Sequence, residues 1–146
     1  MKIDIRKITE GEENIVIRYI EPNPSVERIV GILSGQGGRL WGKADGQSVS
    51  IDPDAILYLE SVDDAVFAYT ADRVLRMEGS LSSFMSEWAD ESFFRCSRSM
   101  VININRVVSL KSLSSNRIDA TMEGGEHIII SRRYASEFRR ILKGDR

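Results

Sequence analysis

The sequence predicts a mainly β fold of the α+β class, in which antiparallel strands are joined by tight turns and accompanied by short helices. The main observation is a run of short strand-like segments separated by turn residues, first over residues 39–77 and again over 100–131. Apolar residues follow helical spacing in only three short segments. With 146 residues, the chain can form one domain with a hydrophobic core and a short extension, but not two large domains.

Residues 1–38 are predicted to form a short βα extension and a linker. A strand is predicted over residues 15–19, where charge and apolar character alternate, and the prolines that follow end it. A helix with Asn23 or Ser25 as its N-cap is predicted next. Its apolar residues recur at helical spacing and are Val26, Ile29, Val30 and Leu33. The glycine-rich segment 34–38 is interpreted as a linker, because it follows a helix and lacks the Gly-Lys-Ser/Thr of a phosphate-binding loop.

The main domain is predicted to span residues 39–146 and to begin with five short strands. The turns between these strands carry Asp-Gly, Pro-Asp, Asp-Asp and Ala-Asp pairs, which favour tight turns. Closely spaced strands with such turns indicate antiparallel hairpins. The five strands are expected over 39–43, 48–52, 55–60, 66–70 and 73–77.

The second half of the domain is predicted to contain two helices and further strands. Ser80 is expected to cap a short helix, whose bulky apolar residues are Leu81, Phe84, Met85 and Trp88. Strands are then expected over 100–104, 107–111, 117–122 and 127–131. The last element is a helix with one apolar face, formed by Tyr134, Phe138, Ile141 and Leu142.

The composition argues against several classes of protein. A single cysteine, Cys96, excludes an internal disulfide and a CxxC zinc site, so we expect no structural metal and no cofactor. No continuous apolar segment suggests a signal peptide or a membrane span, which favours a cytoplasmic protein. Catalysis has little support, since the one histidine, His127, lies inside a predicted strand, where a structural role is the usual one.

The net charge of −2 hides an uneven distribution along the chain. Residues 1–72 contain seven Lys/Arg against thirteen Asp/Glu, whereas residues 92–146 contain eleven against five. The C-terminal part therefore has a net charge of +6. Phosphate binding depends on local positive charge, so any contact with nucleic acid is expected there.

Three sequence blocks, in this order, resemble the LytTR domain: Ile-Leu-Tyr-Leu-Glu at 56–60, Phe-Phe-Arg-Cys-Ser-Arg-Ser-Met-Val-Ile-Asn at 93–103, and Ser-Arg-Arg-Tyr at 131–134. The resemblance implies an antiparallel LytTR-like β fold and a bacterial transcription regulator. Such regulators bind directly repeated promoter sites in double-stranded DNA, with loops of the β fold in successive major grooves. Two copies, hence a homodimer at least on DNA, are expected.

The extension has its own implications under this resemblance. LytTR domains usually follow a receiver domain, but about forty residues are too few for one, so control by aspartyl phosphorylation is not expected. Stand-alone members of the family are sometimes encoded beside small membrane proteins that influence them. A regulatory partner of that kind is therefore one of the expectations.

The resemblance assigns the leading DNA-contacting roles to Arg98 and Arg133, since arginine meets a guanine edge or a phosphate with two donors. The alternative is that each is a solvated surface residue. Arg95 and Arg132 are weaker candidates, for which phosphate contact and plain exposure are equally expected. Three serines are candidate phosphate donors: Ser97, Ser99 and Ser131. Ser131 is at least as well suited to cap the final helix.

Two features of the site depart from a simple DNA-binding reading. The turn at 61–64 corresponds to a third DNA-facing loop of the family, but it carries Asp63 and Asp64, which repel phosphate unless a carboxylate such as that of Asp64 accepts from a cytosine amino group. Asn103 belongs to the motif, yet a structural role at the following turn is favoured. The acidic turn keeps open a second hypothesis, a protein-interaction module of the same fold that has lost DNA affinity.

One further alternative concerns Cys96. It is flanked by Arg95 and lies near Arg98, and neighbouring cations lower the pKa of a thiol and make it reactive. A redox switch at this residue is a minor hypothesis, because the chain has no second cysteine.

Overall fold

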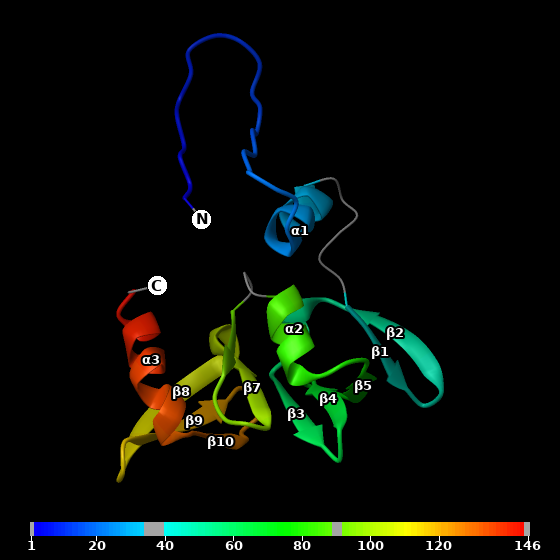
Figure 1. Ribbon diagram of the computed structural model, residues 1–146, viewed down its shortest axis with the longest axis vertical. Coiled ribbons are helices and arrows are strands. Elements are labelled where there is room, and N and C mark those ends of the chain that lie inside the picture. The colour runs from blue at the N-terminus through cyan, green and yellow to red at the C-terminus, as the bar shows by residue number, and fades with distance from the viewer. Residues whose placement is uncertain (1, 34–39, 89–91, 145–146) are drawn as a thin grey trace.

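The computed structural model describes residues 2–33, 40–88 and 92–144, and in these it contains two antiparallel sheets and three α-helices (Figure 1). The larger sheet has seven strands in the order β2-β1-β5-β4-β3-β7-β6. Its strands are β1 (Leu40–Ala44), β2 (Gln47–Ile51), β3 (Tyr58–Val62), β4 (Ala65–Tyr69), β5 (Val74–Met77), β6 (Phe93–Arg95) and β7 (Met100–Asn103). The smaller sheet has the order β10-β9-β8 and consists of β8 (Val107–Leu113), β9 (Arg117–Met122) and β10 (His127–Ile130).

The α-helices are short and accompany the sheets. They are α1 (Pro24–Leu33), α2 (Leu81–Glu87) and α3 (Arg132–Leu142), with two 3₁₀ turns at Pro53–Ala55 and Ile104–Arg106. The predicted mainly antiparallel β fold with three short helices is confirmed. None of the described helices is both long enough and apolar enough to cross a membrane.

Two hydrophobic cores lie on opposite faces of β6 and β7, the two strands at one end of the larger sheet. Phe93 on β6 belongs to the first core and its neighbour Phe94 to the second, because successive side chains of a strand point to opposite faces. Val101 and Ile102 on β7 divide in the same way. Helix α2 contributes Leu81, Phe84 and Trp88 to the first core, and the smaller sheet and α3 complete the second (Figure 1).

Two strands differ from the prediction for local reasons. The strand expected from residue 55 begins only at Tyr58, because Asp52 caps a 3₁₀ turn: its carboxylate accepts a hydrogen bond of 2.9 Å from the Asp54 N–H. Strand β6 was not among the expected strands. It is only three residues long, and it pairs with β7 in antiparallel register, with Phe94 opposite Ile102.

The N-terminal extension is only partly as predicted. Helix α1 is formed and Asn23 is its N-cap, since the Asn23 side-chain oxygen accepts a 3.0 Å hydrogen bond from the Val26 N–H. The strand predicted over 15–19 is not formed: residues 2–22 contain neither helix nor strand. Among the described residues, no other segment pairs with them as a strand. The predicted linker at 34–38 and the domain boundary at 38/39 lie outside the described residues.

Candidate nucleic-acid interface

Three loops of the β domain are tied together at the ends of their strands. They are the β3–β4 turn, the β6–β7 loop at residues 96–99, and the residues just before α3. The Ser61 N–H donates to the Ser99 carbonyl at 2.8 Å, which joins the first loop to the second. The Ser131 N–H donates to the Cys96 carbonyl, also at 2.8 Å, which joins the third to the second. The three loops that carry the DNA-contact candidates thus form one continuous edge, called the loop edge below.

The β6–β7 loop is held from inside by Arg95. Its guanidinium donates to the Arg98 carbonyl at 2.6 Å, to the Ser97 carbonyl at 3.3 Å and to the Ser82 hydroxyl of α2 at 3.0 Å. These bonds fix the backbone on which Arg98 stands. The sequence alternatives for Arg95 were phosphate contact or exposure, and the structure adds a third role, that of fixing the loop. No sequence signal marks that role, since it depends on α2 lying beside the loop.

Arg98 and Arg132 are exposed, and within the described chain their guanidinium groups make neither a hydrogen bond nor an ion pair. Arg133 is exposed as well and lies with its guanidinium carbon 5.5 Å from the centre of the Tyr134 ring. Stacking on a ring restricts an arginine without using its N–H donors in hydrogen bonds. The edge therefore presents free donors from arginines at two of its three loops.

Ser131 occupies the N-cap position of α3, as one of the two sequence interpretations had it, but its side chain makes no capping hydrogen bond. Its carbonyl accepts from the Tyr134 and Ala135 N–H groups, both at 3.0 Å, which begins the helix. The start of α3 therefore lies at the same edge as the β6–β7 loop. A helix N-terminus carries partial positive charge, which adds to that of Arg132 and Arg133.

The acidic turn has a structural explanation. Asp63 and Asp64 form a two-residue hairpin between Val62 and Ala65, with φ values of 50° and 64°. Both residues are thus left-handed, as a type I′ turn requires, and aspartate tolerates this conformation better than most residues. Through the Ser61–Ser99 bond, this negative turn is adjacent to the arginine-bearing loop.

Asn103 is structural, as favoured from the sequence. It is 2% exposed; its side-chain amide donates to the Ile56 carbonyl at 2.9 Å, and its side-chain oxygen accepts from the Asn105 N–H at 3.1 Å. These bonds join β7 to the segment before β3 and shape the turn that follows. Asn103 therefore holds the end of β7 that lies away from the loop edge and does not face outward.

The redox hypothesis for Cys96 is wrong. The side chain is fully buried in the second core, and burial raises the pKa of the thiol to about 12 despite the neighbouring Arg95. A protonated, inaccessible thiol is inert. His127 lies at an exposed strand end with its Nδ1 atom 3.1 Å from Asp119 Oδ1, and no group of three metal-ligating side chains occurs in the described residues.

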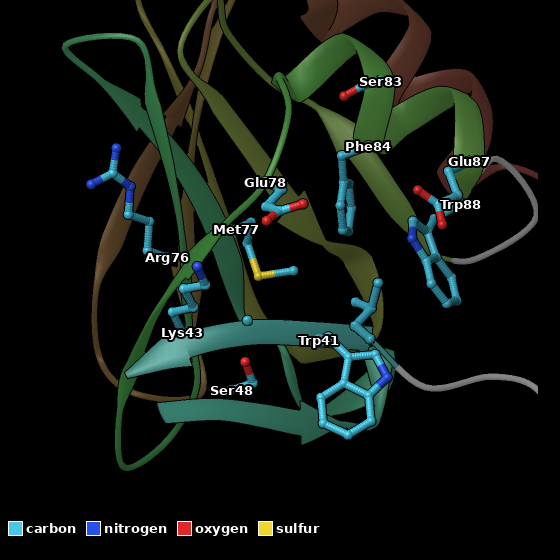
Figure 2. Close-up of a pocket in the computed structure, with 12 residues that line it drawn as sticks. Trp41, Lys43, Ser48, Arg76, Met77, Glu78, Ser83, Phe84, Glu87 and Trp88 are labelled. Atoms are coloured by element: carbon cyan, nitrogen blue, oxygen red, sulfur yellow. The ribbon is translucent and has the colours of Figure 1, made fainter. Parts of the chain in front are cut away.

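A separate pocket of about 330 Å³ lies between β1, β5 and α2 (Figure 2). Lys43 and Arg76 on the strands are balanced there by Glu78 and Glu87. None of the predicted DNA-contacting residues lines it. The pocket therefore has no part in the loop edge.

Comparisons with known proteins agree with this geometry. The family model described as the LytTr DNA-binding domain matches residues 46–143. A solved structure, the LytTr DNA-binding domain of a protein described as a methyl-accepting/DNA response regulator from Bacillus cereus, is similar to this chain with a TM-score of 0.68 and 25% sequence identity. The similarity covers 72% of this chain and 96% of that domain. No curated protein matches the chain.

Proposed function

The chain belongs to the LytTR family of DNA-binding domains, and from that premise we propose that it is a sequence-specific transcription regulator. The family is a DNA-binding one and not an enzymatic one. The observation that carries the proposal is the loop edge, where free arginines from two loops stand on a hydrogen-bonded backbone. The proposed DNA-binding unit is residues 39–146, and the proposed place of action is the bacterial cytoplasm.

We assign base contacts to Arg98 and Arg133. A guanidinium donates two parallel hydrogen bonds to guanine O6 and N7 in the major groove, the commonest specific contact of this kind. Both residues are exposed and stand on different loops of one edge, which suits contacts at separate base positions. A backbone already fixed by Arg95 and Ser131 loses little freedom when DNA binds.

The phosphate contacts are assigned to the polar groups around these arginines. Arg132 at the start of α3 supplies charge, and three hydroxyls supply neutral donors, namely Ser97, Ser99 and Ser131. Phosphate contacts fix the orientation of a protein on the duplex but carry no sequence information. Arg95 is assigned to the support of the loop, with a phosphate contact left to its remaining donors.

The β3–β4 turn is proposed to contribute to base preference more than to DNA affinity. The carboxylate of Asp64 accepts from the amino group of cytosine and repels phosphate, so it favours a cytosine at the base pair it faces. We further propose that two copies bind directly repeated sites, as the family resemblance implies. Each copy then places the three loops of its edge on one repeat. A small membrane protein remains the proposed kind of regulatory partner.

A fluorescence-polarisation titration tests the proposal. Promoter DNA of the protein's own gene and a scrambled duplex are titrated at several salt concentrations. We expect preference for the promoter and an affinity that falls steeply with salt, because each phosphate contact releases counterions. The matched control is Arg73→Ala, an exposed arginine in the turn at the opposite end of β4 from Asp64, which should bind like the parent protein. Absence of binding at low salt would instead support the protein-interaction module.

A further inference from the structure

Residues 2–33 contribute nothing to the two cores of the domain. Of the seventeen large hydrophobic residues exposed in the described chain, ten lie in this segment. Ile3, Ile5 and Ile15 are 81%, 89% and 72% exposed. An exposed apolar surface of this extent marks an interaction site.

The first part of the segment consists of two arms, residues 2–8 and 14–20, joined around Gly11 with φ +98° (Figure 1). Alternate residues of both arms line one shared hollow: Lys2, Asp4, Arg6, Ile8, Asn14, Val16 and Arg18. With a two-residue alternation, Ile3, Ile5 and Ile15 lie on the opposite face. The arms thus have the side-chain pattern of a two-faced ribbon.

The backbone of these arms is unpaired as far as the described residues are concerned. Within the described chain, residues 2–22 make no backbone–backbone hydrogen bond. Extended segments with free N–H and C=O groups are templates for pairing with another strand. The strand that the alternation predicts at 15–19 therefore has the right residues and lacks only a neighbour.

Helix α1 leaves the later part of its apolar stripe exposed, although Val26 near its start is buried. One contact of the helix with the domain is made by Arg28, whose guanidinium carbon lies 4.6 Å from the centre of the Trp88 ring. At 3.6 residues per turn, Arg28 is on the side opposite the stripe that contains Val30 and Leu33. These two side chains are 45% and 52% exposed.

We propose that residues 2–33 form a dimer interface whose occupant is the same segment of a second copy of this chain. The first arms pair as antiparallel strands with Ile5 opposite Ile5, and the apolar face of the ribbon is covered by the stripes of α1. Charge selects this register. It places Asp4 opposite Arg6 of the second copy, and the reverse pair follows by symmetry. The neighbouring symmetric registers, shifted by two residues in either direction, place Asp4 opposite Asp4 or Arg6 opposite Arg6.

The ion pair that Asp4 and Arg6 form within one arm competes only weakly with the proposed pairs between copies. Asp4 and Arg6 form an ion pair of 3.0 Å within one arm, with side chains 58% and 82% exposed. Exposed pairs of this kind contribute little to stability. Exchanging them for pairs between copies costs little, while the backbone groups and the isoleucines gain partners.

The inference is tested without DNA, so its outcome is independent of the proposed function. The molar mass of the full chain is measured by sedimentation equilibrium over a range of concentrations, for the parent and for Asp4→Arg and Arg6→Asp. We expect a dimer for the parent and a dissociation constant about tenfold higher or more for each variant, because both cross-strand pairs become repulsive. Arg73→Asp, a charge reversal at an exposed turn of the domain, should dimerise like the parent.

The decisive step is to mix the two variants. Each variant carries like charges at positions 4 and 6, so the ion pair within an arm stays broken. Between the two variants, however, every cross-strand pair at these positions joins an arginine to an aspartate. Differently tagged variants should form a heterodimer as tight as the parent dimer. A parent that is monomeric at all concentrations, variants that dimerise like the parent, or a mixture that stays dissociated would each overturn the inference.

Discussion

The two regions of this molecule treat the same kind of sequence pattern differently. In the described part of the domain, residues 40–88 and 92–144, most alternating apolar residues lie in strands and face one of two cores, whereas in residues 2–33 they are mostly exposed. Of the twenty-five buried hydrophobic residues in the described chain, only Val26 lies in the N-terminal segment. The difference shows that alternation of apolar and polar residues indicates only that a segment can form a strand. The strand forms when a neighbouring strand pairs with its backbone and another element covers its apolar face.

The largest expected effect on stability comes from truncating an apolar side chain of the domain, and the same change in the N-terminal segment serves as its control. Phe138→Ala removes a fully buried ring of the second core, so we expect the free energy of unfolding to fall by about 3–5 kcal/mol. Ile20→Ala, at a position 101% exposed, should change it by less than about 0.5 kcal/mol. Urea denaturation measures both. Similar losses in the two variants would break the comparison.

A second substitution extends the comparison to Asn103, a buried polar residue at the end of β7. Asn103→Ala leaves the buried Ile56 carbonyl without its donor, and we expect a loss of about 1–3 kcal/mol in unfolding free energy. Asn105→Ala is the control, since it removes a hydrogen bond of 2.8 Å to Ser92 that lies at the surface. A smaller loss for Asn103→Ala than for the control would contradict the structural role.

Burial in the second core also predicts a pH dependence. The Cys96 thiol has a pKa of about 12 when folded and an ordinary value of 9.0 when unfolded. The unfolded chain therefore releases this proton first, so the stability is complete below pH 9 and falls as the pH rises toward 12, by about 1.4 kcal/mol per pH unit at most. Denaturation curves of the parent and Cys96→Ala from pH 8 to 10.5 measure this.

The tyrosines supply the internal control for that experiment. Burial also raises the pKa values of Tyr58 and Tyr69, and both residues remain in the variant. Their contribution is common to both proteins, so only the difference in slope reports Cys96. Equal slopes above pH 9 would mean that the thiol is accessible in the folded protein.

The smallest effect on stability separates two arginines of the loop edge. Arg95→Ala removes three hydrogen bonds that hold the β6–β7 loop, and we expect a loss of about 1 kcal/mol in unfolding free energy. Arg98→Ala should change it by less than about 0.5 kcal/mol, because the side chain has no partner in the described chain. Calorimetric melting of both variants distinguishes Arg95, which holds the loop in place, from Arg98, which the loop exposes to solvent.

Most of the domain could be predicted from local patterns, because turn residues mark where each strand ends. Residues 117–122 were expected as a strand and form β9 over the same range. The prediction of a strand at 15–19 was wrong, since local alternation carries no information about whether a neighbouring strand is present. Strand β6 was missed because three residues are too few for alternation to be recognised.

The candidate site was less accessible to sequence reasoning. Resemblance pointed to Arg98 and Arg133, but the bond between Ser131 and Cys96 joins residues far apart in the chain, and only the fold brings them together. The same holds for the contact of Arg95 with Ser82. Residue type indicates that an arginine suits DNA. Whether its donors are free is decided by its neighbours in space.

The central claim, that the loop edge reads bases through Arg98, is tested most directly by a panel of duplexes with single base-pair substitutions in the preferred site, measured at one salt concentration for the parent, Arg98→Ala and Arg73→Ala. We predict that Arg98→Ala loses the preference at one base position, equivalent to about 1–3 kcal/mol, and keeps it elsewhere, while Arg73→Ala matches the parent. An Arg98→Ala variant that discriminates among all the duplexes as the parent does would contradict the account.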